Sequence, residues 1–308
     1  MHDAARFRFD RPAIARSFTR ASSRYTSAAR LQARVNSELL GRLQFFQLEP
    51  LVILDLGCGT GGGAAALRAR FPKAHVLAVD SAFGMLTEAR RRQRFWRRYA
   101  CLCADGNALP LAPQSVDLVY SNLMLQWCDD LPTLFAEVQS VLKPGGLLLF
   151  STFGPETLQE LRSAWASADR ESHVSAFADM PLLGTALSKA GLAEPVLDRE
   201  VVLTHYAQVH DLMKELRTIG ARHAAADRRR SLTGVKRLQA MVAAYEAVRA
   251  AAGLPASWEV IYGAAFAGAR NAMAQGVEAP GAVAFGPDGE SYVSAAAIRT
   301  RSPGKPSG

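Results

Sequence analysis

The chain has 308 residues, of which 49% are hydrophobic and 21% are charged, and its formal net charge is +8. These proportions are close to those of an average soluble protein, and the length allows one large domain or two small ones. No stretch of 18 apolar residues is present, which argues against a membrane span.

The four cysteines and six histidines are scattered along the chain. They form no CxxC pair and no HExxH motif, so we expect neither a metal site nor a disulfide framework. Free cysteines and an N-terminus without an apolar signal segment favour the cytoplasm. The arginines near the N-terminus leave a transit peptide open, although Asp3 and Asp10 count against one.

The first predicted element is a helix over residues 13–48, which we expect to form an N-terminal helical cap (residues 1–48). After Pro50 the pattern alternates between apolar strands and amphipathic helices. Apolar runs such as "LVIL" and "LLLF" are typical of parallel strands covered on both faces, so the prediction is a doubly wound α/β sheet. Strands are predicted at 51–56, 75–80, 99–104, 116–121 and 146–152, and helices at 62–70, 83–95, 131–142 and from about Glu156.

The second half follows a different pattern. It predicts helices at 179–192, 209–221 and 233–251, and extended segments at 195–206 and 258–267. The helical stretch between the two extended segments is too long for a simple connection, so we expect a lid or partner-docking insertion at about 207–256 within one domain spanning 49–268. Residues 269–308 are rich in Gly, Pro and Ser, which predicts a mobile tail with a hairpin at "GPDG".

The stretch "VILDLGCGTGGGAA" (52–65) carries a strand directly into five glycines. Gly57, Gly59 and Gly62 satisfy the GxGxxG pattern, so a nicotinamide or flavin dinucleotide has to be considered. A carboxylate at Asp55, two residues before the first glycine, would be unfavourable beside a pyrophosphate. The compact form Asp-x-Gly-x-Gly-x-Gly suits a ligand with a cationic amino group, and Gly57, Gly59 and Gly61 let the backbone approach it closely.

Three carboxylates end three successive predicted strands. Asp55 is placed to address an ammonium group, directly or through water, and Asp80 to accept hydrogen bonds from both hydroxyls of a ribose. Asp105 is placed to accept from the exocyclic amine of an adenine. The helix that starts near Gly62 offers free N–H groups to a carboxylate. Amine, ribose, adenine and carboxylate together indicate S-adenosylmethionine (SAM).

This arrangement resembles the class I SAM-dependent methyltransferases over residues 50–153. The resemblance implies a seven-stranded Rossmann-like sheet whose last two strands are the segments at 195–206 and 258–267, one of them antiparallel. We expect Met85 to contact the adenine, and Asn122 and Leu123 to line the methyl-transfer pocket. The full set of expected cofactor-binding residues is Asp55, Gly57, Gly59, Gly61, Asp80, Ser81, Met85, Asp105, Gly106, Asn122 and Leu123.

Four further stretches resemble the malonyl-acyl-carrier-protein O-methyltransferase family, nearly to residue 268. They are "SFTRASSRYTSAARLQ" (17–32), "SNLMLQWC" (121–128), "FSTFGPETLQELR" (150–162) and the region from "SLTGVKRLQ" to "LPASWEVIYG" (231–263). The family implies methylation of the free carboxylate of a malonyl thioester, which starts pimeloyl synthesis for biotin. The implied partner is a malonyl-loaded acyl carrier protein, or malonyl-CoA in its place.

A malonyl carboxylate is already anionic at neutral pH, so its methylation requires alignment and desolvation and no general base. Arg162 is the predicted clamp on that carboxylate, because an arginine fork matches carboxylate geometry. Tyr25 matches a tyrosine of the family and is expected to hydrogen-bond cofactor or substrate, while Trp127 either lines the pocket or fills the core. For docking of an acidic carrier protein we expect the basic residues Lys214, Arg217, Arg222, Arg228, Arg229 and Arg230.

Several alternatives remain open on the sequence. The basic segments at 88–99 and 221–237 also fit a solvated surface, whereas nucleic acid is disfavoured because no zinc knuckle, helix-turn-helix or aromatic-interleaved motif accompanies them. The same fold also serves methyltransferases for small acids or quinone precursors, and a related arginine hydroxylase that assists respiratory complex I assembly. A non-catalytic SAM-binding interaction protein is a further possibility, and Asp55 and Asp105 disfavour an NAD-dependent oxidoreductase.

Overall fold

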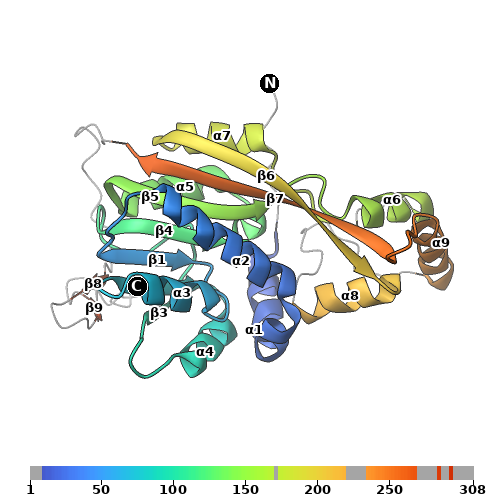
Figure 1. Cartoon of the computed structure of the whole chain (residues 1–308), viewed down its shortest axis with the longest axis horizontal. Coiled ribbons are helices and arrows are strands. Elements are labelled where there is room, and N and C mark those ends of the chain that lie inside the picture. Colours follow the sequence, from blue (N-terminus) through green and yellow to red (C-terminus); the bar gives the residue numbers. More distant parts are fainter. Residues whose placement is uncertain (1–8, 170–172, 220–233, 269–282, 286–290, 294–308) are drawn as a thin grey trace, which may run out of the picture.

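Residues 9–169, 173–219, 234–268, 283–285 and 291–293 are described by the structure, a computed structural model. Their core is a seven-stranded sheet of order β3-β2-β1-β4-β5-β7-β6 (Figure 1). The first five strands pair in parallel, and β7 runs antiparallel to both β5 and β6. The strands are β1 (Val52–Leu56), β2 (His75–Asp80), β3 (Ala100–Cys103), β4 (Val116–Asn122), β5 (Leu142–Phe153), β6 (Leu192–Tyr206) and β7 (Leu254–Ala267).

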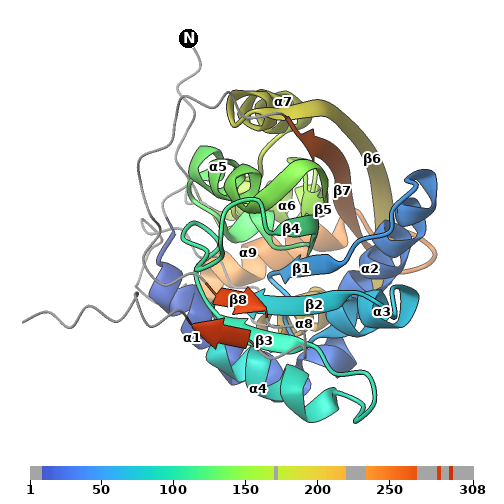
Figure 2. The same cartoon turned by 90° about the vertical axis from the view of Figure 1, so that its left-hand side faces the viewer.

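Helices cover both faces of the sheet, as the continuous apolar strands require. Figure 2 shows α5 and α7 on one side and α2 and α3 on the other. Each face has its own core, with Leu39 and Leu67 fully buried on the α2 and α3 side and Phe135 and Leu187 on the α5 and α7 side. These helices are α2 (Arg30–Arg42), α3 (Gly62–Arg70), α5 (Leu131–Val141) and α7 (Met180–Lys189).

Three helices begin with the same short sequence, Asp-x-Pro. In α1 (Arg11–Ala28), α5 and α7 the aspartate carboxylate accepts the backbone N–H three residues later, and the proline stands in the first turn, where its missing N–H costs nothing. These local signals determine where each of the three helices begins. The capping distances are 3.0 Å from Ala13 N to Asp10, 3.1 Å from Thr133 N to Asp130 and 2.8 Å from Leu182 N to Asp179.

The single helix expected over 13–48 is wrong in one respect, because the chain leaves helical geometry at Ala29 (φ −83°, ψ 53°). The break separates α1 from α2, and a short 3-10 turn (Leu43–Phe45) follows α2. Ala29 is buried, and no residue at the break signals it in the sequence. Because of the break, α2 packs along the sheet while α1 turns toward α4 (Phe83–Arg92) and α8 (Val209–Thr218).

The last two strands form a long antiparallel pair. β7 begins at Leu254, four residues before the expected strand, because Leu254 and Ala256 are fully buried. Figure 1 shows β6 and β7 reaching past β5 toward α8 and α9 (Val235–Glu246), with α6 (Gln159–Ala168) packed on α9. The described part of the predicted insertion therefore consists of α8 and α9, whereas residues 220–233 lie outside the described residues.

The predicted tail also falls mostly outside the described residues. Within it, β8 (Val283–Phe285) and β9 (Ser291–Val293) pair antiparallel on either side of the "GPDG" stretch, as the expected hairpin requires. The domain boundaries at 48 and 268 stay predictions. None of the described helices combines the length and the apolar character that a bilayer span requires.

Candidate functional site

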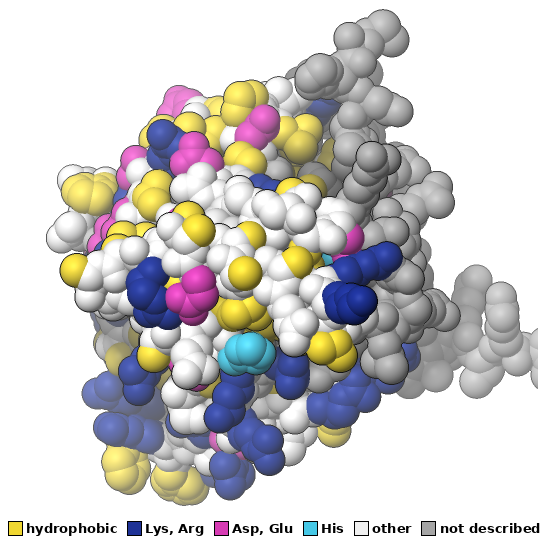
Figure 3. Space-filling model, turned by 90° about the vertical axis from the view of Figure 1, so that its right-hand side faces the viewer, with side chains coloured by type: hydrophobic (Ala, Val, Ile, Leu, Met, Phe, Trp, Pro, Cys, Tyr) yellow, Lys and Arg dark blue, Asp and Glu magenta, His cyan; other side chains and the backbone are white. Residues whose placement is uncertain are grey.

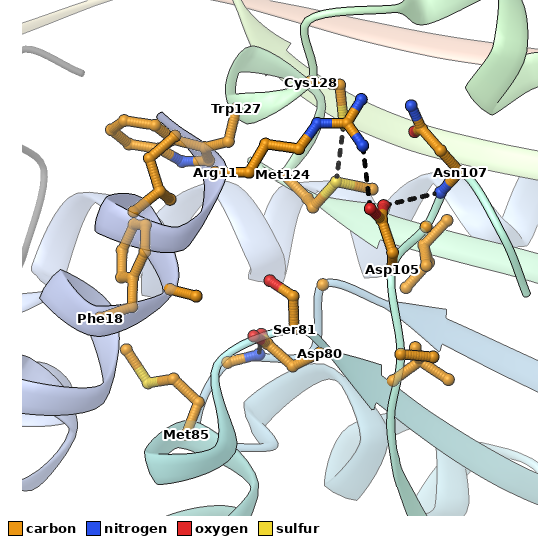
Figure 4. A pocket seen from close by; sticks show the side chains of 18 of the residues that line it. Arg11, Phe18, Asp80, Ser81, Met85, Asp105, Asn107, Met124, Trp127 and Cys128 are labelled. Carbon is orange, nitrogen blue, oxygen red and sulfur yellow. Dashed lines mark hydrogen bonds and ion pairs between the residues drawn. The ribbon is translucent and has the colours of Figure 1, made fainter. Parts of the chain in front are cut away.

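A cavity of about 320 Å³ lies at the carboxyl ends of β1, β2, β3 and β4. Helix α1 covers it, and Figure 4 shows side chains from the strand ends and from α1 pointing into the same space. Ligands of open α/β sheets bind at this edge, where the strand order reverses on either side of β1. Ten residues predicted from the sequence line this cavity, which we call the larger cavity to distinguish it from a smaller one described below. They are Tyr25, Gly57, Gly59, Asp80, Ser81, Met85, Asp105, Gly106, Asn122 and Leu123.

The glycine loop forms the floor of the cavity. The N–H groups of Gly57 and Cys58 both donate to the carbonyl oxygen of Val79, at 2.8 and 3.0 Å, so the loop is tied to the end of β2. Gly57 has φ +75°, and a Cβ there would stand 2.2 Å from the side chain of Met124, which itself lines the cavity. No residue with a side chain fits this position. Gly61 ends the loop with φ +82° at the start of α3 but does not line the cavity.

Two backbone N–H groups hold the carboxylate of Asp80 in place. Its Oδ2 accepts the N–H of Gly59 at 2.9 Å, and its Oδ1 accepts the N–H of Ala82 at 2.8 Å. Burial raises the pKa of Asp80, and the two backbone hydrogen bonds counteract that rise. Each oxygen keeps a further lone pair, so the carboxylate can still accept hydroxyl groups from a ligand in the cavity.

Asp55, the third predicted carboxylate, does not line the cavity. Its side chain is 2% exposed and lies beneath the loop, where a Cβ on Gly63 would be 2.9 Å from its Oδ2. Burial raises the pKa of Asp55 to about 7, and a backbone hydrogen bond from Ala64 in the first turn of α3 partly offsets that rise. Of the three carboxylates predicted to surround one ligand, Asp80 and Asp105 therefore line the cavity and Asp55 does not. Asp55 instead faces the helix N-terminus, where the dipole favours a negative charge.

Arg11 is a cavity residue that sequence reasoning missed. Its Nη1 donates to Asp105 Oδ2 at 2.9 Å (Figure 4), and its Nε donates to Asp129 Oδ1 at 2.8 Å. The first turn of α1 is thereby joined to the segments that follow β3 and β4. Asp105 in turn accepts the N–H of Asn107 at 3.0 Å. The Asp-x-Pro helix start is a local signal for the position of Arg11, but its partners are 94 and 118 residues away.

We expect Arg11→Ala to weaken cofactor binding moderately. Both ion pairs are partly exposed, and pairs of this kind contribute up to about 1 kcal/mol each, so the dissociation constant should rise about 3- to 10-fold. The loss should shrink in 1 M salt, where the wild-type pairs are screened. Calorimetric titration with SAM measures this, with Arg34→Ala as the control because Arg34 pairs with Glu200 away from the cavity. Equal affinity for wild type and Arg11→Ala at low salt would contradict the prediction.

A second, smaller cavity of about 120 Å³ adjoins the first. The two share Phe18, Tyr25, Leu123 and Trp127 as lining residues. The ring of Phe18 makes edge-to-face contacts with Trp127, at 5.2 Å between centroids, and with Tyr25, at 6.3 Å. An aromatic constriction therefore joins the larger cavity to a second space between α2, α6 and α8.

Arg162 does not line either cavity, contrary to its predicted role as a carboxylate clamp. Its Nη1 donates to the carbonyl oxygen of Pro155 at 2.7 Å and its Nη2 to that of Thr157 at 3.1 Å. The guanidinium thus holds the turn "FGPETL" that precedes α6. The same turn is joined to β7, since the N–H of Leu158 donates to Ser257 and the N–H of Gly154 to Glu259.

From this geometry, Arg162→Ala should lower stability more than it lowers turnover. Two hydrogen bonds from a charged group are lost, and because the side chain is partly solvated we expect about 1–2 kcal/mol less free energy of unfolding. Urea denaturation measures that loss, and initial rates at saturating substrates measure turnover. If the variant had wild-type stability but no turnover, the result would support the original prediction that Arg162 binds the acceptor carboxylate.

The fold is shared with solved structures and with a methyltransferase family model. A family model described as "Methyltransferase domain" matches residues 54–150. The YcgJ protein from Bacillus subtilis aligns with a TM-score of 0.55 at 16% identity, covering 75% of this chain and 98% of that chain. Identity this low shows the fold alone. The seven-stranded class I methyltransferase sheet predicted from the sequence is confirmed.

Curated relatives are similar over most of their length. A malonyl-[acyl-carrier protein] O-methyltransferase from Xylella fastidiosa is 48% identical over 84% of this chain and 88% of that protein. The protein of the same name from Legionella pneumophila is 35% identical over 86% of this chain and 94% of that protein. With the cavity at the strand ends and a likeness that reaches far beyond the methyltransferase domain, this chain belongs to the malonyl-[acyl-carrier protein] O-methyltransferase family.

Proposed function

We propose that the protein binds SAM in the larger cavity and transfers its methyl group to the free carboxylate of a malonyl group on acyl carrier protein. The product is a methyl ester that masks the charge of the chain end, as priming of pimeloyl synthesis for biotin requires. The observation that carries the proposal is the pair of adjoining cavities joined at Phe18, Tyr25, Leu123 and Trp127. The methyl group of SAM and the carboxylate of the acceptor can meet at these shared residues.

The residues of the larger cavity fit SAM. Gly57 and Gly59 leave room for a ligand against the backbone, and the Asp80 carboxylate is oriented by two N–H groups while its remaining lone pairs suit ribose hydroxyls. Asp105 follows β3 and is held by Asn107 and Arg11, and in this proposal its carboxylate accepts from the adenine amine. A volume of about 320 Å³ is within the range of small-molecule sites. When bound, SAM supplies an electrophilic methyl group on a sulfonium.

The protein's contribution to the reaction is alignment and exclusion of water. A malonyl carboxylate is already the nucleophile, so one of its oxygens forms the new bond to the methyl carbon as the sulfur–methyl bond breaks, and no proton moves. Aromatic side chains at the constriction keep water from the reacting atoms. Burial raises the pKa of Tyr25 above its ordinary value, so its hydroxyl stays neutral and can donate a hydrogen bond at this point.

Carrier-protein docking belongs to the same proposal. Lys214 and Arg217 are exposed on α8, beside α1, whose outer residues include the exposed Arg16, Arg20 and Arg24. Figure 3 shows Lys and Arg side chains gathered over the lower part of this end of the molecule. A small acidic partner would be steered to such a surface. Arg222 and Arg228–Arg230 lie outside the described residues.

We also propose a cytoplasmic location, where malonyl thioesters and SAM would be at hand. All four cysteines are free thiols, as a reducing compartment leaves them.

Transfer of a labelled methyl group tests the function directly. Incubation with methyl-labelled SAM and malonyl-loaded carrier protein should give a base-labile methyl ester on the malonyl group, and carrier protein loaded with acetate should stay unlabelled. Malonyl-CoA in place of the carrier protein reports the preference between the two acceptors. Tight SAM binding without ester on either acceptor would overturn the proposal in favour of a non-catalytic SAM-binding protein.

Reversing the charge of α8 should separate docking from chemistry. The double variant Lys214→Glu, Arg217→Glu is expected to raise the KM for malonyl-carrier protein about 10-fold at low salt, because several charges of the approaching partner are repelled. The KM for malonyl-CoA should change less. The matched control is Lys189→Glu, an exposed charge at the end of α7 on the opposite side of the sheet. Equal effects on both acceptors would show that α8 does not contact the carrier protein.

A further inference from the structure

The smaller cavity is mainly apolar, and two of its polar side chains, those of Gln126 and Thr157, are engaged within the protein. The amide of Gln126 has both ends engaged, its Nε2 donating to the carbonyl of Leu123 at 2.7 Å and its Oε1 accepting from Thr152 at 3.2 Å. The hydroxyl of Thr157 donates to the carbonyl oxygen of Glu259 at 3.0 Å. These groups hold the walls of the cavity in position and have little left to offer a ligand.

His173 is also committed to the protein. Its Nε2 lies 2.9 and 3.1 Å from the two carboxylate oxygens of Asp169, and its ring stacks on Trp165 with centroids 3.8 Å apart. Arg237 on α9 approaches the same carboxylate at 3.8 Å. The Arg237 ion pair joins α9 to the end of α6, and the stack on Trp165 of α6 leaves His173 little freedom to turn toward a ligand.

Gln32 differs from these residues. It projects from the first turn of α2 into the smaller cavity, and its buried Oε1 has no hydrogen-bond partner among the described residues. Its backbone is anchored, since the Nδ2 of Asn122 donates to the Gln32 carbonyl at 3.2 Å and Asn122 itself accepts from Ser151 at 2.9 Å. A buried amide atom without a partner costs about 1–3 kcal/mol, so its retention next to the constriction needs a reason.

We propose that Gln32 binds the carboxylate of the acceptor, an inference that rests on the proposed function. The terminal amide can turn over, which places its Nε2 donor where the unpartnered oxygen lies. One carboxylate oxygen then accepts from this amide, and the other stays free to attack the methyl group at the constriction next to Tyr25 and Leu123. A neutral donor suits this reaction, because a cationic side chain paired with the carboxylate would weaken the carboxylate as a nucleophile. Gln32 is therefore a residue that determines specificity for a carboxylate.

Two substitutions test this assignment. Gln32→Glu puts a second negative charge against the acceptor and should lower kcat/KM for the malonyl thioester at least 100-fold at saturating SAM. Gln32→Met keeps the size of the side chain but removes the donor, and should lower it about 10-fold. The SAM dissociation constant should stay near the wild-type value, and the thermal midpoint of Gln32→Met should not fall, because methionine removes the unpartnered amide. Gln139→Met is the matched control, since Gln139 also has a buried Oε1 without a partner but lies on α5, away from both cavities.

A carboxamide analogue gives a readout that a structural role would not produce. A malonamoyl thioester, in which an amide replaces the carboxylate, should inhibit Gln32→Glu more strongly than it inhibits the wild type, because the glutamate accepts from the new N–H group. Methyl transfer by the wild type but unchanged kcat/KM in both Gln32 variants would overturn the inference and leave the proposed function intact. Equal losses of SAM affinity and turnover would overturn it too, by assigning Gln32 to the packing of α2. A wild type without transfer would refute the proposed function itself.

Discussion

Replacing Asp80 with alanine is expected to lower the affinity for SAM by about 100-fold or more. The carboxylate accepts the N–H groups of Gly59 and Ala82, and in the proposed binding mode its remaining lone pairs accept from the ribose, so alanine removes both kinds of contact at once. Hydrogen bonds to a charged group contribute about 1.5–3 kcal/mol each, and two of them already correspond to more than two decades of affinity. Because the glycine loop also loses one of its ties to β2, the hydrogen bond from Gly59, the loop itself should loosen.

Calorimetric titration with SAM, at a temperature where the variant is folded by circular dichroism, measures this effect. Asp80→Asn should fall between wild type and Asp80→Ala, because the amide keeps one acceptor. Asp198→Ala serves as the control, since Asp198 is an exposed carboxylate on β6 that pairs with Arg42 far from the cavity. An affinity of Asp80→Ala within about threefold of wild type would show that Asp80 does not hold the cofactor.

Asp55→Asn should stabilise the ligand-free protein at neutral pH. Burial raises the pKa of Asp55 to about 7, whereas an unfolded chain has the ordinary value near 4. Between these values the folded protein binds more protons than the unfolded chain, so the stability that Asp55 contributes is full below about pH 4 and is lost as the pH rises through 7. Asparagine does not titrate and avoids that loss. About three pKa units correspond to at most about 4 kcal/mol of difference above pH 7.

Denaturation of both proteins in urea from pH 5 to pH 8.5 tests this linkage. The difference in free energy of unfolding should grow with pH and level off above pH 7. The matched control is Asp117→Asn, because Asp117 is a partly exposed carboxylate that pairs with Lys143 and accepts the N–H groups of Leu51 and Val52. A difference between wild type and Asp55→Asn that does not change with pH would mean that Asp55 is already ionised in the folded protein at the low end of the range.

The site shows where local reasoning reaches its limit. Placing Asp80 and Asp105 at strand ends was enough to predict that they would line the cavity, because carboxyl ends of parallel strands meet at one edge of the sheet. Asp55 ends a strand as well, yet its side chain lies on the α3 side. Both faces of β1 are buried, so the alternation of side chains gives no sign in the sequence of which face meets the ligand.

Arg162 and Gln32 are two further residues whose surroundings local sequence reasoning does not predict. An arginine in a family motif next to the fifth strand suggested a clamp, but three-dimensional packing brings its guanidinium to the carbonyls of its own turn. Gln32 carries no charge and fits an ordinary amphipathic helix, so nothing local singles it out. Its significance comes from a cavity whose other lining residues are up to 226 positions away, at Trp258.

The sequence by itself determined the order of strands and helices, the glycine loop and the capped helix starts. These features depend on neighbours within a few residues, through backbone conformation, the period of the side chains and capping. The break at Ala29, the ion pairs of Arg11 and the orientation of Asp55 and Arg162 were decided only by the tertiary structure. Each of these depends on groups that are distant along the chain, or on competition between burial and hydrogen bonding. That balance exists only once the sheet, its two helical layers and the N-terminal helices are packed together.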